Sequence, residues 1–301
     1  MLSEATSLAS TQFLSPIESE RVSDGRLWPD LGQLECLHDI SNATLWSFMD
    51  FKGRPSYNPA LLRDFHGWQD HIQDLKGEAG DAFKYVVLGS RRQGAFCFGG
   101  DLDYFTDCIN RRDADALAAY GRSCIQILHR NWRTCDSELV TIGLVQGDAL
   151  GGGFESLLSF DIIVAEKGAR FGFPEQMFGL FPGMGALTFL GRKLGTAKAE
   201  ELVRTGKLLT AEELHELGLV HILAEPGQGI EATQTYIRKH AARHPAHYRM
   251  YRAMKRANPI SYEELDDIVG LWVEACLTLE QHNLAVMRRL VTAQSKMSAA
   301  A

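Results

Sequence analysis

A run of three glycines, Gly151 to Gly153, is the feature of this sequence that most restricts how the chain can fold. It lies between an apolar segment, ELVTIGLVQG (138–147), which is typical of a buried strand, and an apolar stretch that contains one acid, Glu155. Glycine is unfavourable inside a regular element, and a carboxylate is unfavourable in apolar surroundings. The pattern predicts a strand that turns tightly into a helix, at a point where both the backbone and the acid have a functional role.

Segments typical of strands and of helices alternate through the first two thirds of the chain. Continuous apolar runs at 84–90, 138–147 and 160–166 predict buried strands, and shorter apolar stretches between Leu34 and Phe51 predict further ones. The helical spacing of apolar residues over 58–72 and 113–132 predicts helices between them. This alternation predicts an α/β fold.

The sequence becomes mostly helical after about residue 186. Thr210 and Glu213 form a capping-box pattern, and a short strand is expected over 219–223. A long helix is predicted from about Ser261, with a break before its end. No composition shift separates this part sharply from the rest.

Composition disfavours several classes of protein. The 301 residues carry a formal net charge of −7, which disfavours a nucleic-acid binder. The six cysteines have irregular spacing and no C-x-x-C pair, so reduced thiols in a cytoplasmic protein are expected rather than a zinc site or a disulfide framework. No apolar run is long enough to predict a membrane span. Residues 1–28 lack periodicity and are interpreted as a mobile N-terminal arm.

Three stretches share a pattern in which several glycines lie among apolar residues: FCFGGDLDYF (96–105), QGDALGGGFESL (146–157) and FGFPEQMFGLFPGMGA (171–186). Glycines after a strand let a ligand approach the backbone, and amides that begin a helix have no partner within it. Two such amides from separate loops could bind one developing oxyanion. Tight packing of strand against helix is the simpler explanation of the glycines, and it remains open at this point.

Two glutamates accompany these loops. Glu155 follows the glycines, and Glu175 comes 20 residues later, after a proline. Burial among phenylalanines would raise the pKa of either carboxyl towards neutrality, as a general acid or base requires. The alternatives are a buried acid satisfied by a backbone amide for Glu155, and a structural acid at a helix start for Glu175.

Together, FCFGGDL, ALGGGFE and FPEQMFGLFPGMGA resemble the crotonase (enoyl-CoA hydratase/isomerase) superfamily, and LLTAEELHELGLVHIL is similar to the stretch that follows in that family. The resemblance covers roughly residues 32–225. It implies a ClpP/crotonase-like spiral of ββα units with a helical C-terminal part, divided here into a core domain over 29–200 and a helical region over 201–301. It also implies a homotrimer or a dimer of trimers.

The resemblance implies a role for each matching residue. Gly100 and Gly152 supply the oxyanion-hole amides, and Glu155 and Glu175 form the acid–base pair. The substrate-binding residues implied are Leu150, Gly151, Met184 and Trp272. Without the family, the helical spacing of Trp272 favours a core position. No metal and no cofactor are implied.

Within the superfamily the chain is most similar to bacterial diffusible signal factor synthases. These enzymes are implied to dehydrate a 3-hydroxyacyl-acyl carrier protein to a cis-2-enoyl thioester and then to hydrolyse the thioester, giving a quorum-sensing fatty acid. A sensor kinase receiver domain is an implied partner. Two alternatives stand beside this hypothesis: an ordinary enoyl-CoA hydratase/isomerase acting on CoA thioesters, and a non-catalytic interaction protein. The sequence leaves open the acyl chain, the choice of carrier, and which glutamate is the acid.

Overall fold

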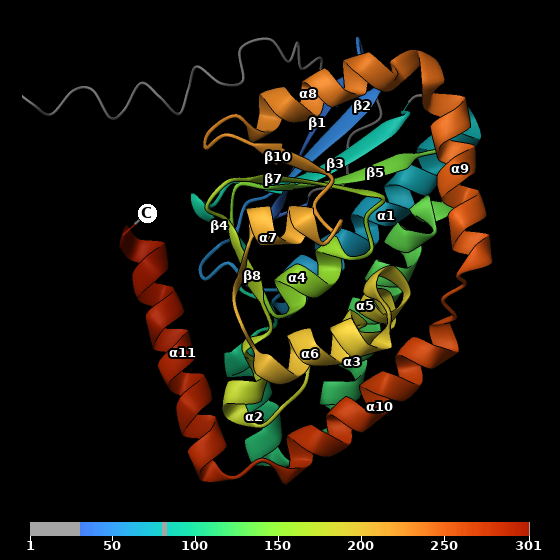
Figure 1. Cartoon of the computed structure of the whole chain (residues 1–301). Coiled ribbons are helices and arrows are strands. Elements are labelled where there is room, and N and C mark those ends of the chain that lie inside the picture. Colours follow the sequence, from blue (N-terminus) through green and yellow to red (C-terminus); the bar gives the residue numbers. More distant parts are fainter. Residues whose placement is uncertain (1–30, 80–82, 301) are drawn as a thin grey trace, which may run out of the picture.

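The computed structural model describes residues 31–79 and 83–300 of the chain. The N-terminal arm expected over residues 1–28 lies outside the described residues. The order of elements is a β-hairpin, then units in which two strands are followed by helices, then a run of helices (Figure 1). The predicted α/β spiral of ββα units with a helical C-terminal part is confirmed.

Six strands form the larger sheet, in the order β1-β2-β3-β5-β7-β10. Their bounds are β1 Leu34–Asp39, β2 Thr44–Met49, β3 Tyr85–Ser90, β5 Val140–Val145, β7 Ile162–Glu166 and β10 Ile222–Ala224. The hairpin β1-β2 is antiparallel, and the other neighbours are parallel. Every residue of β5 and β7 is buried because both faces of the sheet are covered, which explains their continuous apolar sequences.

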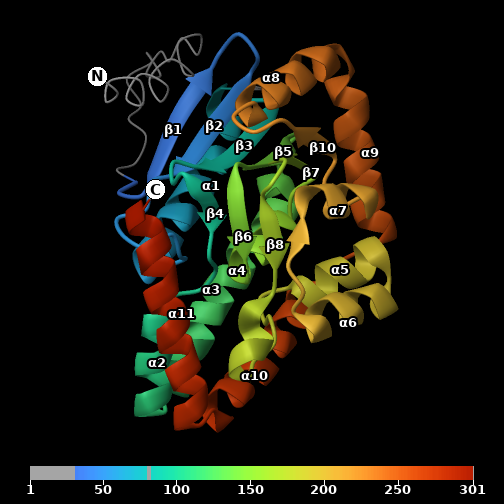
Figure 2. The same cartoon turned by 60° about the vertical axis from the view of Figure 1, so that its left-hand side comes forward.

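Four short strands form a second sheet, in the order β4-β6-β8-β9. Their bounds are β4 Gly94–Cys97, β6 Gly147–Leu150, β8 Arg170–Gly172 and β9 Leu209–Thr210. Each of the first three follows a strand of the larger sheet within a few residues, and Figure 2 shows β4, β6 and β8 side by side. Because these three strands are parallel, the loops that leave their C-terminal ends meet at one edge of the sheet.

Helices connect and cover the two sheets. Their bounds are α1 Pro59–Ala79, α2 Leu102–Arg111, α3 Ala114–Trp132, η1 Thr134–Asp136, α4 Gly152–Leu157, η2 Pro174–Phe178, α5 Ala186–Leu194, α6 Thr196–Thr205, α7 Ala211–Glu216, α8 Gly229–His240, η3 Ala241–Arg243, α9 His244–Ala257, α10 Tyr262–Thr278 and α11 Gln281–Ala300. Side chains that precede a helix cap several of them: Ser261 accepts the Glu264 amide before α10. The predicted capping box of Thr210 and Glu213 is present at α7.

The helices lie on both faces of the larger sheet. In Figure 1, α8 and α9 pass over one face, where Ile237 and Tyr248 pack against the sheet, and α1 and α3 lie on the other side. Beyond the sheets, α10 packs along α3, and α11 contacts α2 and η2. The division between residues 200 and 201 stays a prediction; it falls inside α6, and β9 and β10 beyond it join the two sheets.

One predicted strand was placed too early. The strand expected over 219–223 is β10, Ile222–Ala224. The amides of Leu219 and Val220 donate to the carbonyl of Leu214, so these residues complete the end of α7 and do not pair in the sheet. The break predicted in the last long helix lies between α10 and α11.

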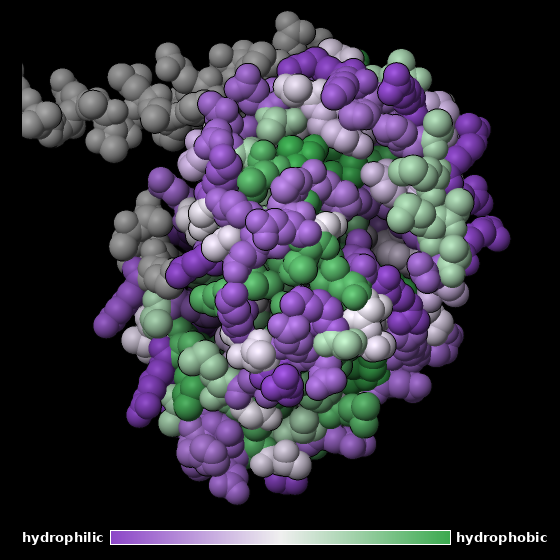
Figure 3. All heavy atoms as spheres, in the orientation of Figure 1, coloured by the Kyte–Doolittle hydropathy of each residue, from purple (hydrophilic) through white to green (hydrophobic). Residues whose placement is uncertain are grey.

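Hydrophilic residues cover most of the face drawn in Figure 3, and a strip of apolar residues lies over α9. The exposed methionines Met250 and Met254 belong to this helix. None of the helices in the described part of the chain is both long and apolar enough to cross a membrane.

Candidate active site

The loops that follow β4 and β6 touch each other. A Cβ placed on Gly99, whose φ is +96°, would lie 2.9 Å from both the amide nitrogen of Gly152 and the carbonyl oxygen of Leu150. A Cβ on Gly152 would lie 3.5 Å from the amide nitrogen of Gly100. Glycine is needed here because the two backbones approach more closely than a side chain allows. The structure therefore brings the amides of Gly100 and Gly152 into one place.

Both of these amides are available to a ligand. Among the described residues, neither the Gly100 nor the Gly152 N–H donates a hydrogen bond to the protein. Gly152 is the first residue of α4, where an N–H has no partner inside the helix. Both glycines line one cavity, so the two donors face the same space.

Glu155 lies one turn into α4 and is 2% exposed. Its Oε1 accepts hydrogen bonds from the amides of Met184 (2.9 Å) and Ala186 (3.1 Å). Because Ala186 begins α5, the partial positive charge of a helix N-terminus also favours the carboxylate. Glu155 is thus buried, but two donors support its ionised form.

Glu175 is the second residue of η2, which follows β8 directly. A Cβ on Gly151 would lie 2.4 Å from Glu175 Oε1, so this carboxyl lies against the α-carbon of Gly151. The residue as a whole is half-buried, yet its Oε2 is fully buried and has no hydrogen-bond partner among the described residues. Glu175 therefore has a buried, unsatisfied oxygen, and its side chain lines the same cavity as Glu155.

Burial changes the acidity of both carboxyls. It raises the pKa of Glu155 to about 7, against the opposing effect of the two backbone donors. It raises the pKa of Glu175 to about 8, and the nearby charge of Glu155 adds to that rise. Because Glu155 accepts two backbone donors and Glu175 Oε2 accepts none, the arrangement favours an ionised Glu155 beside a protonated Glu175, so one carboxyl is ready to accept a proton and the other to donate one.

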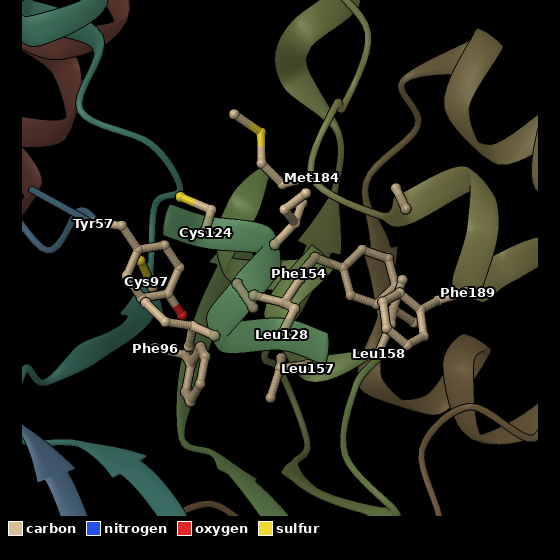
Figure 4. Packing of buried hydrophobic residues seen from close by; sticks show 14 of the residues in the cluster. Tyr57, Phe96, Cys97, Cys124, Leu128, Phe154, Leu157, Leu158, Met184 and Phe189 are labelled. Atoms are coloured by element: carbon tan, nitrogen blue, oxygen red, sulfur yellow. The ribbon is translucent and has the colours of Figure 1, made fainter. Parts of the chain in front are cut away.

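The cavity is narrow, with a volume of ≈ 70 Å³, and its wall is mostly apolar. Met184 and Trp272, which the family resemblance implied as substrate contacts, line it, and that role stays a prediction. The ring of Trp272 packs edge-on against that of Phe105, with 5.1 Å between the ring centroids. A Cβ on Gly183 would lie 2.5 Å from Trp272 Cγ, so this glycine makes room for the indole. Figure 4 shows the packing around this region, with Tyr57 and Cys124 on one side of Leu128 and Phe154 and Phe189 on the other.

Two residues predicted to contact substrate do not line the cavity. Leu150 is the last residue of β6 and pairs with Gly172, and Gly151 lies beneath the Glu175 carboxyl. Their roles as substrate contacts stay predictions. The structure adds cavity residues that sequence reasoning missed: Tyr57 and Ser156 both line it, and their hydroxyls are 2.7 Å apart. No sequence signal joins these two, since their contact depends on the packing of distant segments.

In the part of the chain that the structure describes, no group of three or more His, Cys, Asp or Glu side chains is placed to hold a metal ion. His215 and His221 hydrogen-bond to backbone groups: the first contacts the Val220 carbonyl, and the second accepts the Ile163 amide. All six cysteines are free thiols.

The pKa shift of Glu175 predicts how its removal affects stability. Because its folded-state pKa is raised, the folded protein holds a proton that the unfolded chain releases above about pH 4.5, and the group destabilises the fold increasingly up to about pH 8. Glu175→Gln is therefore expected to gain stability over the natural protein, by on the order of several kcal/mol at pH 8 and far less at pH 5. Chemical denaturation of both proteins at the two pH values measures this difference.

Glu213 supplies a control of opposite sign. Its bonds to Lys207 and to the Thr210 amide lower its pKa, so it contributes stability above about pH 4.5 that is lost as the pH falls through its lowered folded value. Glu213→Gln should therefore lose stability at neutral pH. If Glu175→Gln instead loses stability as the pH rises, the burial assigned to its carboxyl is wrong.

Comparison with known proteins gives the context of this site. The family model for enoyl-CoA hydratase/isomerase matches residues 54–265. The Bacillus subtilis protein YngF, named as an enoyl-CoA hydratase/isomerase, is 31% identical over 156 residues, which are 52% of this chain and 56% of that protein. The peroxisomal fatty acid beta-oxidation multifunctional protein AIM1 of Arabidopsis thaliana is 29% identical over 60% of this chain and 24% of that protein. The chain thus matches about half the length of YngF and about a quarter of AIM1.

Solved structures share the fold. An enoyl-CoA hydratase from Bacillus halodurans gives a TM-score of 0.70 at 23% identity, covering 86% of this chain and 99% of that one. Human mitochondrial delta3-delta2-enoyl-CoA isomerase gives a TM-score of 0.71 at 18% identity, covering 88% and 99%. Pseudomonas aeruginosa DspI gives a TM-score of 0.62 at 22% identity, covering 79% and 95%.

Proposed function

The chain belongs to the enoyl-CoA hydratase/isomerase family, and on that premise we propose that it adds water to, or removes it from, an acyl thioester at the cavity between Glu155 and Glu175. The observation that carries the proposal is a pair of carboxyls, each with a pKa raised by burial, that line one apolar cavity with two unpaired backbone amides. This combination suits proton transfer beside a carbonyl whose oxygen gains negative charge.

The amides of Gly100 and Gly152 are proposed to hold the thioester oxygen. As charge moves onto that oxygen, both donors strengthen their bonds to it, which stabilises an enolate-like state. The donors belong to backbone segments fixed by contact at Gly99, so little reorganisation is needed during the reaction. Removing one donor of this kind typically costs about 10²–10³ in rate.

The two acids are proposed to divide the proton transfers according to the hydrogen bonds that each carboxyl accepts. In the direction of hydration, ionised Glu155 accepts a proton from the water that attacks Cβ, and protonated Glu175 delivers a proton to Cα. Dehydration runs through the same steps in reverse, starting with the proton on Glu155. This assignment rests on the two backbone donors that Glu155 has and on the unpartnered Oε2 of Glu175.

A more specific function extends this proposal. The motif resemblance supports a signal synthase that dehydrates a 3-hydroxyacyl-acyl carrier protein and then hydrolyses the cis-2-enoyl thioester. The same carboxyls could activate water for hydrolysis, and the same amides could hold the tetrahedral oxyanion. A trimer or dimer of trimers, and regulation by a receiver domain, rest on that resemblance as well.

An assay with two substrates separates the general function from the specific one. Purified protein is incubated with a trans-2-enoyl-CoA and, separately, with a 3-hydroxyacyl-acyl carrier protein, and the products are identified by mass spectrometry. Hydration of the CoA thioester without release of free acid supports a hydratase. Release of a free cis-2-enoic acid from the carrier protein supports the synthase. Turnover of neither thioester by folded protein contradicts both.

A non-catalytic scaffold is the least favoured function. Each buried carboxyl with a raised pKa destabilises the folded protein at neutral pH, and a binding scaffold gains nothing from keeping two of them beside a cavity. Sites of this kind retain such groups where they take part in proton transfer.

A further inference from the structure

The cavity that the two acids line also has polar side chains in its wall. Most of the wall is made of apolar side chains from several segments, among them Leu62, Phe65, Leu88 and Leu128. The polar side chains in the wall include Gln69 of α1, Asn131 of α3 and Ser159, which follows α4. All three are buried, at 0%, 5% and 2% exposure.

Two of these three polar residues lie several positions along the chain from the lining residues nearest the acids. Along α4 and the turn after it, the lining passes from Gly152 and Glu155 to Ser159. Along α3 it passes from Cys124 to Asn131. Cys124 lies close to Glu155, whose charge adds to the rise that burial causes in the pKa of the Cys124 thiol. Asn131 comes seven positions after Cys124 in α3, which corresponds to about 10 Å of helix. We infer that an acyl chain whose thioester lies at Gly152 extends along α3 towards Asn131 and Gln69.

Gln69 has an acceptor that the protein leaves unused. Its Nε2 donates to the Ile127 carbonyl at 2.9 Å, which fixes the orientation of the amide. Its Oε1 is fully buried and has no hydrogen-bond partner among the described residues. The other two polar side chains bond to each other and to the backbone and not to this oxygen: the Asn131 amide donates to Ser159 Oγ at 2.8 Å, and that hydroxyl donates to the Ser156 carbonyl at 2.6 Å.

An unsatisfied buried acceptor is costly, and a ligand that brings a donor removes that cost. A fully apolar chain of the same length would instead cover the Gln69 Oε1 without satisfying it. Sites that are built to hydrogen-bond a substrate hydroxyl reject analogues that lack it. The chemistry of the far end therefore favours a chain with a hydroxyl there.

We propose that Gln69 is a specificity-determining residue that selects acyl thioesters carrying a hydroxyl group near the end of the chain remote from the thioester. The proposal deepens the proposed function and rests on it, since it takes the thioester to lie at the Gly100 and Gly152 amides. It assigns to the substrate a polar end that the catalytic residues do not require.

Paired substrates test the proposal. Enoyl-CoA thioesters of medium chain length are compared with their ω-hydroxylated counterparts of equal length, and kcat/KM is measured for each. The natural protein is expected to prefer the hydroxylated chain at its best length by roughly 5- to 100-fold. In Gln69→Met the ratio should fall to about one or below it. In the control Leu62→Met, which changes only the apolar wall, it should stay unchanged.

Two results would overturn the proposal: a natural protein that prefers the plain chain at every length, or a folded Gln69→Met that keeps the preference for the hydroxylated chain. Gln69→Leu replaces the first variant if that one does not fold. Calorimetric binding of saturated acyl-CoA pairs, with and without the ω-hydroxyl, gives the same comparison without turnover. Binding preference without turnover would count against the proposed function alone, whereas turnover without preference would count against Gln69 alone.

Discussion

Replacing either buried glutamate with glutamine is expected to lower kcat by about 10²–10⁴ while leaving the protein folded. Glutamine has the size of glutamate, and at position 155 it can still accept the Met184 and Ala186 amides, but at either position it cannot take up or release a proton. Hydration of an enoyl thioester, measured under saturating substrate, reports the loss. Glu175→Gln should lose activity even as it gains stability, so an unfolded variant cannot explain the result.

Glu166 provides the matched control. It is also a buried glutamate, but its carboxylate accepts the amides of Gly227 and Gly229, at 2.8 and 2.9 Å, outside the cavity. Glu166→Gln should lose stability and keep its kcat. Equal losses of kcat in all three variants would show that the loss follows from removing any buried acid.

Substituting Gly151→Ala is expected to reduce kcat by at least about 10²-fold, because it moves a catalytic group without removing it. The new Cβ would lie 2.4 Å from Glu175 Oε1, and the φ of +52° adds backbone strain. The carboxyl has to shift, and a displacement of about 1 Å can cost 10²-fold in rate. The initial rate of hydration, together with a structure of the variant, checks both the loss and its cause.

Gly168→Ala separates displacement from strain. Gly168 also has a left-handed backbone, with φ at +89°, but its Cβ would meet nothing within 4 Å. This variant should lose a little stability and retain its activity. A similar loss of activity in both variants would mean that backbone strain, and not the position of Glu175, is responsible.

Much of the site follows from local sequence. The glycines after β4 and β6 and the acid in α4 form a pattern within a few residues, and parallel strands necessarily bring their C-terminal loops together. The sequence therefore predicted that Gly100, Gly152, Glu155 and Glu175 would share one space, and the structure places all four around one cavity. Their catalytic roles stay predictions until the variants are measured.

The cavity wall could not be predicted in the same way. Leu150 is next to the glycines in sequence, yet the alternation of side chains along β6 and its pairing with Gly172 keep it out of the lining. Gln69 and Asn131 reach the cavity only because α1 and α3 pack against each other. Such contacts depend on how distant segments pack, for which a single sequence has no local signal.

The two amides that hold Glu155 couple the pocket wall to the acid. Met184 lines the cavity with its side chain and binds the carboxylate with its backbone, so a ligand that displaces this segment also removes donors from the acid. A carboxylate that loses its donors becomes more basic and takes up a proton from solution. Thermodynamic reciprocity then requires that any such ligand bind more tightly as the pH falls, and that its heat of binding change with the ionisation enthalpy of the buffer.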